Sequence, residues 1–120
     1  MSVALWICQG LLAAVFFWSG AQKISQPKER LLATGQTGVR AYSLPFIRFI
    51  AACELAGAVG LIVPRATSIL PVLTPLAAAG LGVIMIGAAR AHAQLHEPKN
   101  VVTNVVLLAL CLFVAIGRLA

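Results

Sequence analysis

Glu54 is an acidic residue inside an otherwise apolar segment that is bounded by Arg48 and Arg65. A charged side chain near the centre of a membrane-spanning helix costs about 2.5–3.5 kcal/mol on insertion scales, so other groups must compensate it. Burial disfavours the ionised form of a carboxyl group, whereas a neighbouring cation favours it. A carboxyl group balanced between these effects is suited to general acid/base chemistry. Glu54 is therefore the first candidate for a catalytic residue.

Polar side chains from three other segments are expected at the level of Glu54. At about 1.5 Å of rise per residue, Ser19, Glu54 and Asn104 lie about 6, 9 and 7.5 Å from the basic residues that bound their segments on one side. His92 lies close to the same boundary. Because these residues come from four segments, they predict a shared polar pocket. We expect Glu54 and His92 to be catalytic, and the substrate-binding residues to be Ser19, Gln22, Lys23, Arg90 and Asn104.

Helical spacing predicts which of these side chains face inward. Met85 and His92 share one helix face, whereas Arg90 points the opposite way. We therefore expect only one of His92 and Arg90 to face the pocket and to pair with Glu54. In the last segment, the inward stripe is predicted to hold Asn100, Thr103, Asn104, Leu107 and Cys111. The structural alternative for Glu54 is a buried ion pair or hydrogen bond that only fixes the register of the helices.

The spacing of His92 and His96 would place two rings on one helix face, where they could bind a metal ion or a haem. The chain has only these two histidines, and its three cysteines are widely spaced without a C-x-x-C pair. We therefore predict no metal site, no disulfide and no cofactor, with haem or quinone as the alternatives. The missing cysteine pair also argues against a dithiol oxidoreductase.

The elements that must position these residues are four apolar segments. Of the 120 residues, 61% are hydrophobic and 10% are charged, which lies far outside the range of soluble domains. A membrane-spanning helix needs about 20 apolar residues. Spanning helices are predicted at about 3–22, 46–63, 66–92 and 99–118. The sequence predicts an all-α integral membrane four-helix bundle that forms a single transmembrane domain over residues 1–120.

The connections between these helices are predicted to be short, apart from the loop at about 24–45. A short interfacial helix is expected at 27–33. A tight turn at Pro64 and Arg65 would make the second and third helices an antiparallel hairpin. The first segment could instead be a cleaved signal peptide, but it lacks a basic region before its apolar run.

Basic residues predict the orientation in the membrane. The loops after the first and third helices share one face and hold seven of the nine basic residues, namely Lys23, Lys28, Arg30, Arg40, Arg48, Arg90 and Lys99. Cytoplasmic loops of membrane proteins are enriched in Lys and Arg. We predict a multi-pass protein of the inner or plasma membrane, with loops 24–45 and 94–98 cytoplasmic and both termini outside. The net charge of +6 does not predict nucleic-acid binding, because these residues lie at the ends of apolar runs.

Short motifs in all four segments resemble one family. They are Phe16-x-x-x-Gly20-x-x-Lys23, the run from Glu54 to Leu61, the run from Pro75 to Leu81 followed by Met85 and His92, and Asn104. This pattern resembles the DoxX-like family of small four-helix membrane proteins. The resemblance implies the four-helix fold, and it relates the chain to membrane subunits that are associated with thiosulfate or sulfide oxidation, with quinones and with membrane redox complexes. The chain is expected to lack a soluble domain and has no cysteine pair, which argues against electron transfer.

Three functions are consistent with these patterns. The first is a membrane enzyme, of isomerase, hydrolase or cyclase type, that takes a lipophilic small molecule from the bilayer and acts on it by acid/base chemistry at Glu54. The second is a non-catalytic subunit of a redox or quinone-linked complex, whose basic loop from Lys28 to Arg40 contacts a soluble redox partner. The third is a structural scaffold. Dimers or trimers that bury glycine-rich faces are an expected form of homo-oligomer.

Overall fold

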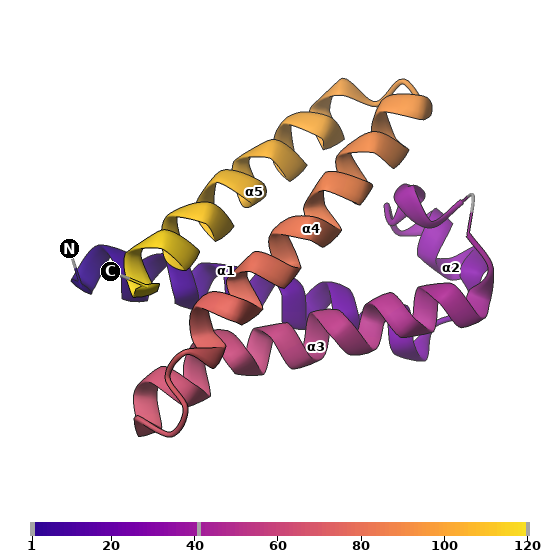
Figure 1. The fold of residues 1–120 in the computed structure, drawn as a ribbon. Helices are drawn as coiled ribbons and strands as arrows, with labels where there is room; N and C mark the ends of the chain where they lie inside the picture. Colours follow the sequence, from indigo (N-terminus) through magenta and orange to yellow (C-terminus); the bar gives the residue numbers. More distant parts are fainter. Residues whose placement is uncertain (1, 41, 120) are drawn as a thin grey trace.

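The computed structural model describes residues 2–40 and 42–119, and Figure 1 shows their arrangement. The elements in chain order are α1 (Ser2–Ser25), α2 (Lys28–Ala33), the 3-10 helix η1 (Thr37–Val39), α3 (Leu44–Thr67), α4 (Leu73–Gln94) and α5 (Pro98–Leu119). Four of these helices are long and apolar enough to span a membrane. The described residues contain no strand, and the predicted all-α membrane bundle is confirmed.

The four long helices are arranged as two pairs. α1 packs along α3, α4 packs along α5, and α3 joins the pairs through its contacts with α4. Figure 1 shows the α4–α5 hairpin diverging from α3 toward the end of the molecule that carries α2, while the start of α1 and the end of α5 lie toward the other end. Because α1 and α5 contact each other less than the paired helices do, the two pairs enclose a space toward the α2 end.

The core lies where the pairs meet, away from α2. It includes Leu12 and Phe16 of α1, Leu61 of α3, and Leu81 and Met85 of α4. Many large apolar side chains are instead exposed, such as Phe17, Phe49 and Val83, as expected for helices that face lipid.

Small residues bring the pairs together. A Cβ atom on Gly60 would lie 2.8 Å from the Cβ of Ala77, and one on Gly57 would lie 2.8 Å from the Leu81 side chain. Within the α1–α3 pair, a Cβ atom on Gly20 would lie 3.0 Å from the Ala51 carbonyl oxygen of α3. In lipid, such close packing replaces the hydrophobic force that drives soluble bundles together.

The turn between the second and third spanning helices is not where the sequence pattern put it. α3 continues through Pro64 to Thr67, so the prediction of a tight turn at Pro64 and Arg65 is wrong. Membrane helices tolerate proline because neighbouring groups satisfy the freed carbonyl. The chain turns instead just before Pro71, where Ser68 and Leu70 have positive φ angles, and α4 begins at Leu73 rather than at 66. The short helix expected at 27–33 is present as α2.

Gly60 and Gly80 offer a matched test of this packing. An added Cβ at Gly60 meets the rigid Cβ of Ala77, whereas one at Gly80 meets nothing within 4 Å. Glycine in a helix interior is about 0.5–1 kcal/mol less favourable than alanine. Gly80→Ala is therefore expected to raise the free energy of unfolding slightly, and Gly60→Ala to lower it by about 1–3 kcal/mol through overpacking. Unfolding of the purified protein by SDS in mixed micelles measures both. Equal stability of the two variants would contradict the close approach of α3 and α4.

Candidate intramembrane site

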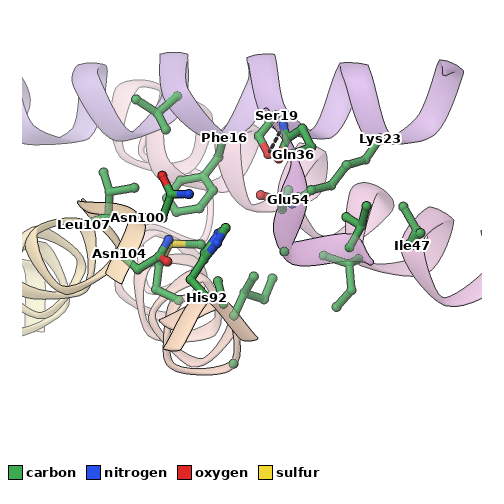
Figure 2. A pocket seen from close by; sticks show the side chains of 18 of the residues that line it. Phe16, Ser19, Lys23, Gln36, Ile47, Glu54, His92, Asn100, Asn104 and Leu107 are labelled. Carbon is green, nitrogen blue, oxygen red and sulfur yellow. Dashed lines mark hydrogen bonds and ion pairs between the residues drawn. The ribbon is translucent and has the colours of Figure 1, made fainter. Parts of the chain in front are cut away.

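A cavity of about 500 Å³ lies between the two helix pairs (Figure 2). All four long helices line it, and the connection between α2 and α3 contributes Gly35, Gln36, Gly38, Val39 and Tyr42. Its apolar lining includes Phe16, Ile47 and Leu107. Its polar lining residues are Ser19, Lys23, Gln36, Glu54, His92, Asn100, Thr103 and Asn104. The cavity is thus mainly apolar, with a limited set of polar groups from several helices.

Glu54 forms an ion pair with Lys23 across α1 and α3. The Lys23 Nζ lies 2.8 Å from the Glu54 Oε1, and the side chains are 13% and 1% exposed. Arg48 of α3 donates a hydrogen bond of 2.5 Å to the backbone oxygen of Lys23, which ties the end of α1 to α3. The close approach at Gly20, one turn before Lys23, lets the lysine reach the carboxylate.

The expected partner of Glu54 was therefore wrong. His92 pairs with Glu97 instead, and Arg90 is exposed and does not line the cavity. Lys23 was expected in the pocket as a substrate-binding residue, not as the partner of Glu54. Its flexible stem folds back toward the carboxylate instead, since pairing offsets the cost of burying both charges.

His92 occupies the opposite side of the cavity, where η1 crosses it. Its Nδ1 lies 2.7 Å from the Glu97 Oε1, and the Thr37 hydroxyl donates to the same oxygen at 2.8 Å. With Glu97 ionised, Nδ1 carries the hydrogen, so that Nε2 of the neutral ring is a proton acceptor. A Cβ atom on Gly38 would lie 3.0 Å from this Nε2. Glycine at position 38 therefore allows η1 to pass close over the ring.

The segment that covers the cavity end, residues 34–40, is held by polar contacts; we refer to it as the cap. Besides the Thr37 contact, Gln36 Nε2 donates to the Ser19 hydroxyl oxygen at 3.3 Å and to the Gln22 Oε1 at 3.1 Å. Val39 packs with Leu31 and Ile47 in a small separate cluster. The cap thus contacts α1, α3 and the connection between α4 and α5.

Asn104 lies deeper in the wall and is 8% exposed. Its amide Nδ2 contacts the Met85 sulfur at 3.6 Å, and its Oδ1 has no hydrogen-bond partner among the described residues. Asn100, Thr103 and Leu107 line the cavity beside it, and Cys111 is buried in the core, so the predicted inward stripe of the last helix is confirmed.

The structure brings five of the seven predicted site residues to this cavity. Ser19, Lys23, Glu54, His92 and Asn104 all line it. Gln22 lies behind them as the acceptor for Gln36, and Arg90 lies outside. His96 does not share a helix face with His92, because α4 ends at Gln94 and His96 is an exposed loop residue with a φ of 57°.

Sequence reasoning missed Gln36, Thr37 and Glu97. All three lie in connections, where no helical period indicates which side chains point inward. The five-residue separation of His92 and Glu97 gave no signal, because it falls across a helix end. Among the described residues, no group of three or more His, Cys, Asp or Glu side chains could hold a metal ion.

The cavity extends to the lipid-facing sides of the bundle. Among its lining residues, Trp18 of α1 is 66% exposed and Val83 of α4 is 68% exposed. Phe46 of α3, which also lines the cavity, is 43% exposed. Such exposed lining side chains lie at the rim, where the cavity opens between the long helices.

Removing Lys23 or Glu54 separately and together tests whether the two charges interact. Lys23→Met leaves a carboxylate buried without a partner and is expected to lower the free energy of unfolding by about 3–5 kcal/mol. Glu54→Gln should cost less, because a lysine near a helix end can extend to water. The double variant is expected to be more stable than Lys23→Met alone. SDS unfolding measures all three, with Lys28→Met as a control for loss of a cation. Strictly additive losses would show that the charges are independent.

The stability of the cap is expected to depend on pH through the Glu97 carboxyl group. The hydrogen bond from His92, followed by the one from Thr37, holds the pKa of the Glu97 carboxyl below its ordinary value of 4.5. A lowered pKa means that this contact stabilises the cap fully above pH 4.5 and is lost as the pH falls through the lowered value. Hydrogen exchange of residues 34–40, corrected for the intrinsic rate, should accelerate in that range. Glu97→Gln should remove the pH step, and Glu29→Gln, at an exposed carboxyl on α2, should keep it. If the exchange rate still rises at low pH in Glu97→Gln, another titrating group is responsible for the change.

The sequence was compared with protein-family models, with curated proteins and with solved structures. The model of the DoxX-like family matches residues 7–114, a range that includes every residue lining the cavity. Comparisons with curated proteins and with solved structures gave no match. Since the match covers most of the chain and the structure has four apolar helices of spanning length, the resemblance of the motifs is confirmed. The chain is a multi-pass membrane protein that belongs to the DoxX-like family.

Proposed function

We propose that this protein is a membrane enzyme that performs general acid/base chemistry on a lipophilic small molecule. The observation that carries the proposal is the buried Glu54–Lys23 ion pair in the wall of a mainly apolar cavity. The reaction classes that need only such groups are isomerisation, epoxide opening and cyclisation. No cofactor is required by this chemistry.

The size and lining of the cavity support a small-molecule ligand. Its volume of about 500 Å³ lies within the range of about 300–1,000 Å³ that is typical of ligand pockets. An apolar body would pack against Phe16, Ile47 and Leu107, and a polar end would lie toward the Glu54–Lys23 pair. The openings near Trp18 and Val83 offer such a ligand a path from the bilayer without crossing water.

Each polar group has a role in this proposal. The Glu54 carboxylate accepts a proton from the ligand, and the Lys23 ammonium stabilises or protonates the oxygen on which negative charge develops. His92 Nε2 is the second proton acceptor, with Glu97 fixing its tautomer. Asn104 is a positioning residue for the polar end. In an isomerisation the proton taken at one atom is returned at another, so the enzyme regains its charges after each turnover.

A non-catalytic subunit of a redox or quinone-linked complex is the alternative. It is favoured by the basic side chains around the cap, since Arg30 and Arg40 are exposed where a soluble partner could bind. In that case the same cavity would hold its ligand without changing it. A purely structural scaffold does not need a cavity of this size.

Two glycine substitutions separate ligand binding from other effects. Gly87 lines the cavity and an added Cβ there meets nothing within 4 Å, so Gly87→Trp should fill the space without disturbing the ion pair. Gly80 is equally unobstructed but does not line the cavity, which makes Gly80→Trp the matched control. Mass spectrometry of lipophilic compounds that copurify with the protein should find a compound with wild type and Gly80→Trp, and lose it with Gly87→Trp.

Glu54→Gln then separates catalysis from binding. Cells expressing wild type should contain a product of the bound compound, either an isomer of equal mass and different retention or a compound heavier by one water molecule. Cells expressing Glu54→Gln should accumulate the unconverted compound, and the purified variant should still retain it. Identical compounds in both cell extracts would favour the non-catalytic alternative, and retention by Gly87→Trp would place the ligand elsewhere.

A further inference from the structure

Trp6, Gln9 and Arg118 form a second polar cluster, away from the cavity. It lies at the end of the bundle where α1 begins and α5 ends (Figure 1). Arg118, in the last turn of α5, donates from Nε to the Gln9 Oε1 of α1 at 2.7 Å. Its guanidinium carbon lies 5.2 Å from the centre of the Trp6 ring, a cation–π arrangement. Gln9 is fully buried and donates in turn to the Leu61 carbonyl oxygen of α3 at 2.5 Å. The guanidinium is therefore held in place by fixed groups of the fold.

Two positive charges lie at this end of the bundle. Arg65 is an exposed residue in the last turn of α3, toward the same end of the bundle. The Nη2 of Arg118 is buried and has no hydrogen-bond partner among the described residues. Burying a charged donor without an acceptor is costly.

The acidic side chains of the chain do not neutralise this pair. The sequence has three acidic residues in total. Glu54 is paired with Lys23 and Glu97 with His92, both at the cavity, and Glu29 lies on α2 toward the other end. None of these carboxylates is therefore the acceptor for the Arg118 guanidinium.

We propose that Arg65 and Arg118 bind a phosphate group, that of an anionic phospholipid at the membrane surface, beside Trp6. Guanidinium groups match phosphate oxygens with paired hydrogen bonds. Trp and Arg are typical of the level where the lipid headgroups lie. The neighbouring Ile7 and Ile116 are 59% and 67% exposed, so acyl chains of the same lipid can pack beside the site. A free phosphate ion would bind the two arginines but would make no contact with the apolar surface at Ile7 and Ile116.

The site is distinct from the proposed reaction. Trp6 and Arg118 lie outside the range matched by the family model, and neither lines the cavity. Through Gln9, the Arg118 guanidinium joins α1, α3 and α5 at one end of the bundle. A bound lipid phosphate would neutralise the cations at this junction.

The tryptophans of the chain allow a direct test. Trp6 and Trp18 are the only two, so Trp18→Phe leaves Trp6 as the sole tryptophan reporter. This protein is reconstituted into phosphatidylcholine vesicles that contain an equal mole fraction of either dibrominated phosphatidylglycerol or dibrominated phosphatidylcholine, because bromine quenches nearby tryptophan. We expect phosphatidylglycerol to quench Trp6 with a roughly fivefold preference, the size expected for one basic residue at a membrane surface.

Charge substitutions identify the groups that make the site. Arg118→Gln and Arg65→Gln should each reduce the preference, and Arg118→Lys should keep part of it, with circular dichroism checking that each variant folds. Arg90→Gln, at an exposed arginine toward the other end, should leave it unchanged. No preference in the Trp18→Phe protein, or an equal loss in Arg90→Gln, would overturn the proposal. Loss of the preference on adding inorganic phosphate, but not chloride of equal ionic strength, would assign the site to free phosphate and overturn the lipid assignment.

Discussion

The burial of one carboxylate in a membrane bundle constrains the rest of this structure. Glu54 is almost fully removed from solvent, and in such surroundings an unpaired charge would cost several kcal/mol. The chain meets this constraint with a lysine from a neighbouring helix, and the lysine reaches the carboxylate because Gly20 lets α1 lie against α3. The helix pair α1–α3 is thus a single unit that presents a charged dyad to the space beside it. The α4–α5 hairpin supplies the apolar wall opposite and a second dyad, His92 with Glu97.

Much of this fold could be predicted from the sequence, because the bilayer fixes the length of a spanning helix and leaves few choices for an apolar chain. The convergence of Ser19, Glu54 and Asn104 on one cavity follows from their equal distances from one membrane boundary. Helical periodicity also placed Arg90 opposite His92, and the structure leaves Arg90 exposed. The turn before α4 was predicted at Pro64 and Arg65, whereas the structure accommodates Pro64 inside α3.

The pairing of charges could not be predicted in the same way. The depth in the membrane and the helix face determine where the Cα atom of a residue lies. The side chain of Lys23 is long and flexible, so its direction depends on the neighbouring side chains. The partner of His92 comes from a connection, and the cap residues Gln36 and Thr37 come from another, where no periodicity is available. Side-chain pairing across elements depends on packing that only coordinates reveal. The location of the candidate site and most of its residues could therefore be predicted. The hydrogen bonds and ion pairs between those residues could not.

The two ends of the cavity differ in the kind of contact that closes them. At the α2 end, the cap is held to its surroundings by hydrogen bonds of Gln36 and Thr37, whose partners water can replace at little cost. Between the helices the rim is formed by apolar side chains such as Trp18 and Val83, which exclude water but yield to other apolar groups. The cap and the rim are therefore two kinds of barrier around the same carboxylate, one made of hydrogen bonds and the other of apolar contacts. Water would loosen the first barrier and not the second, whereas apolar molecules would loosen the second and not the first.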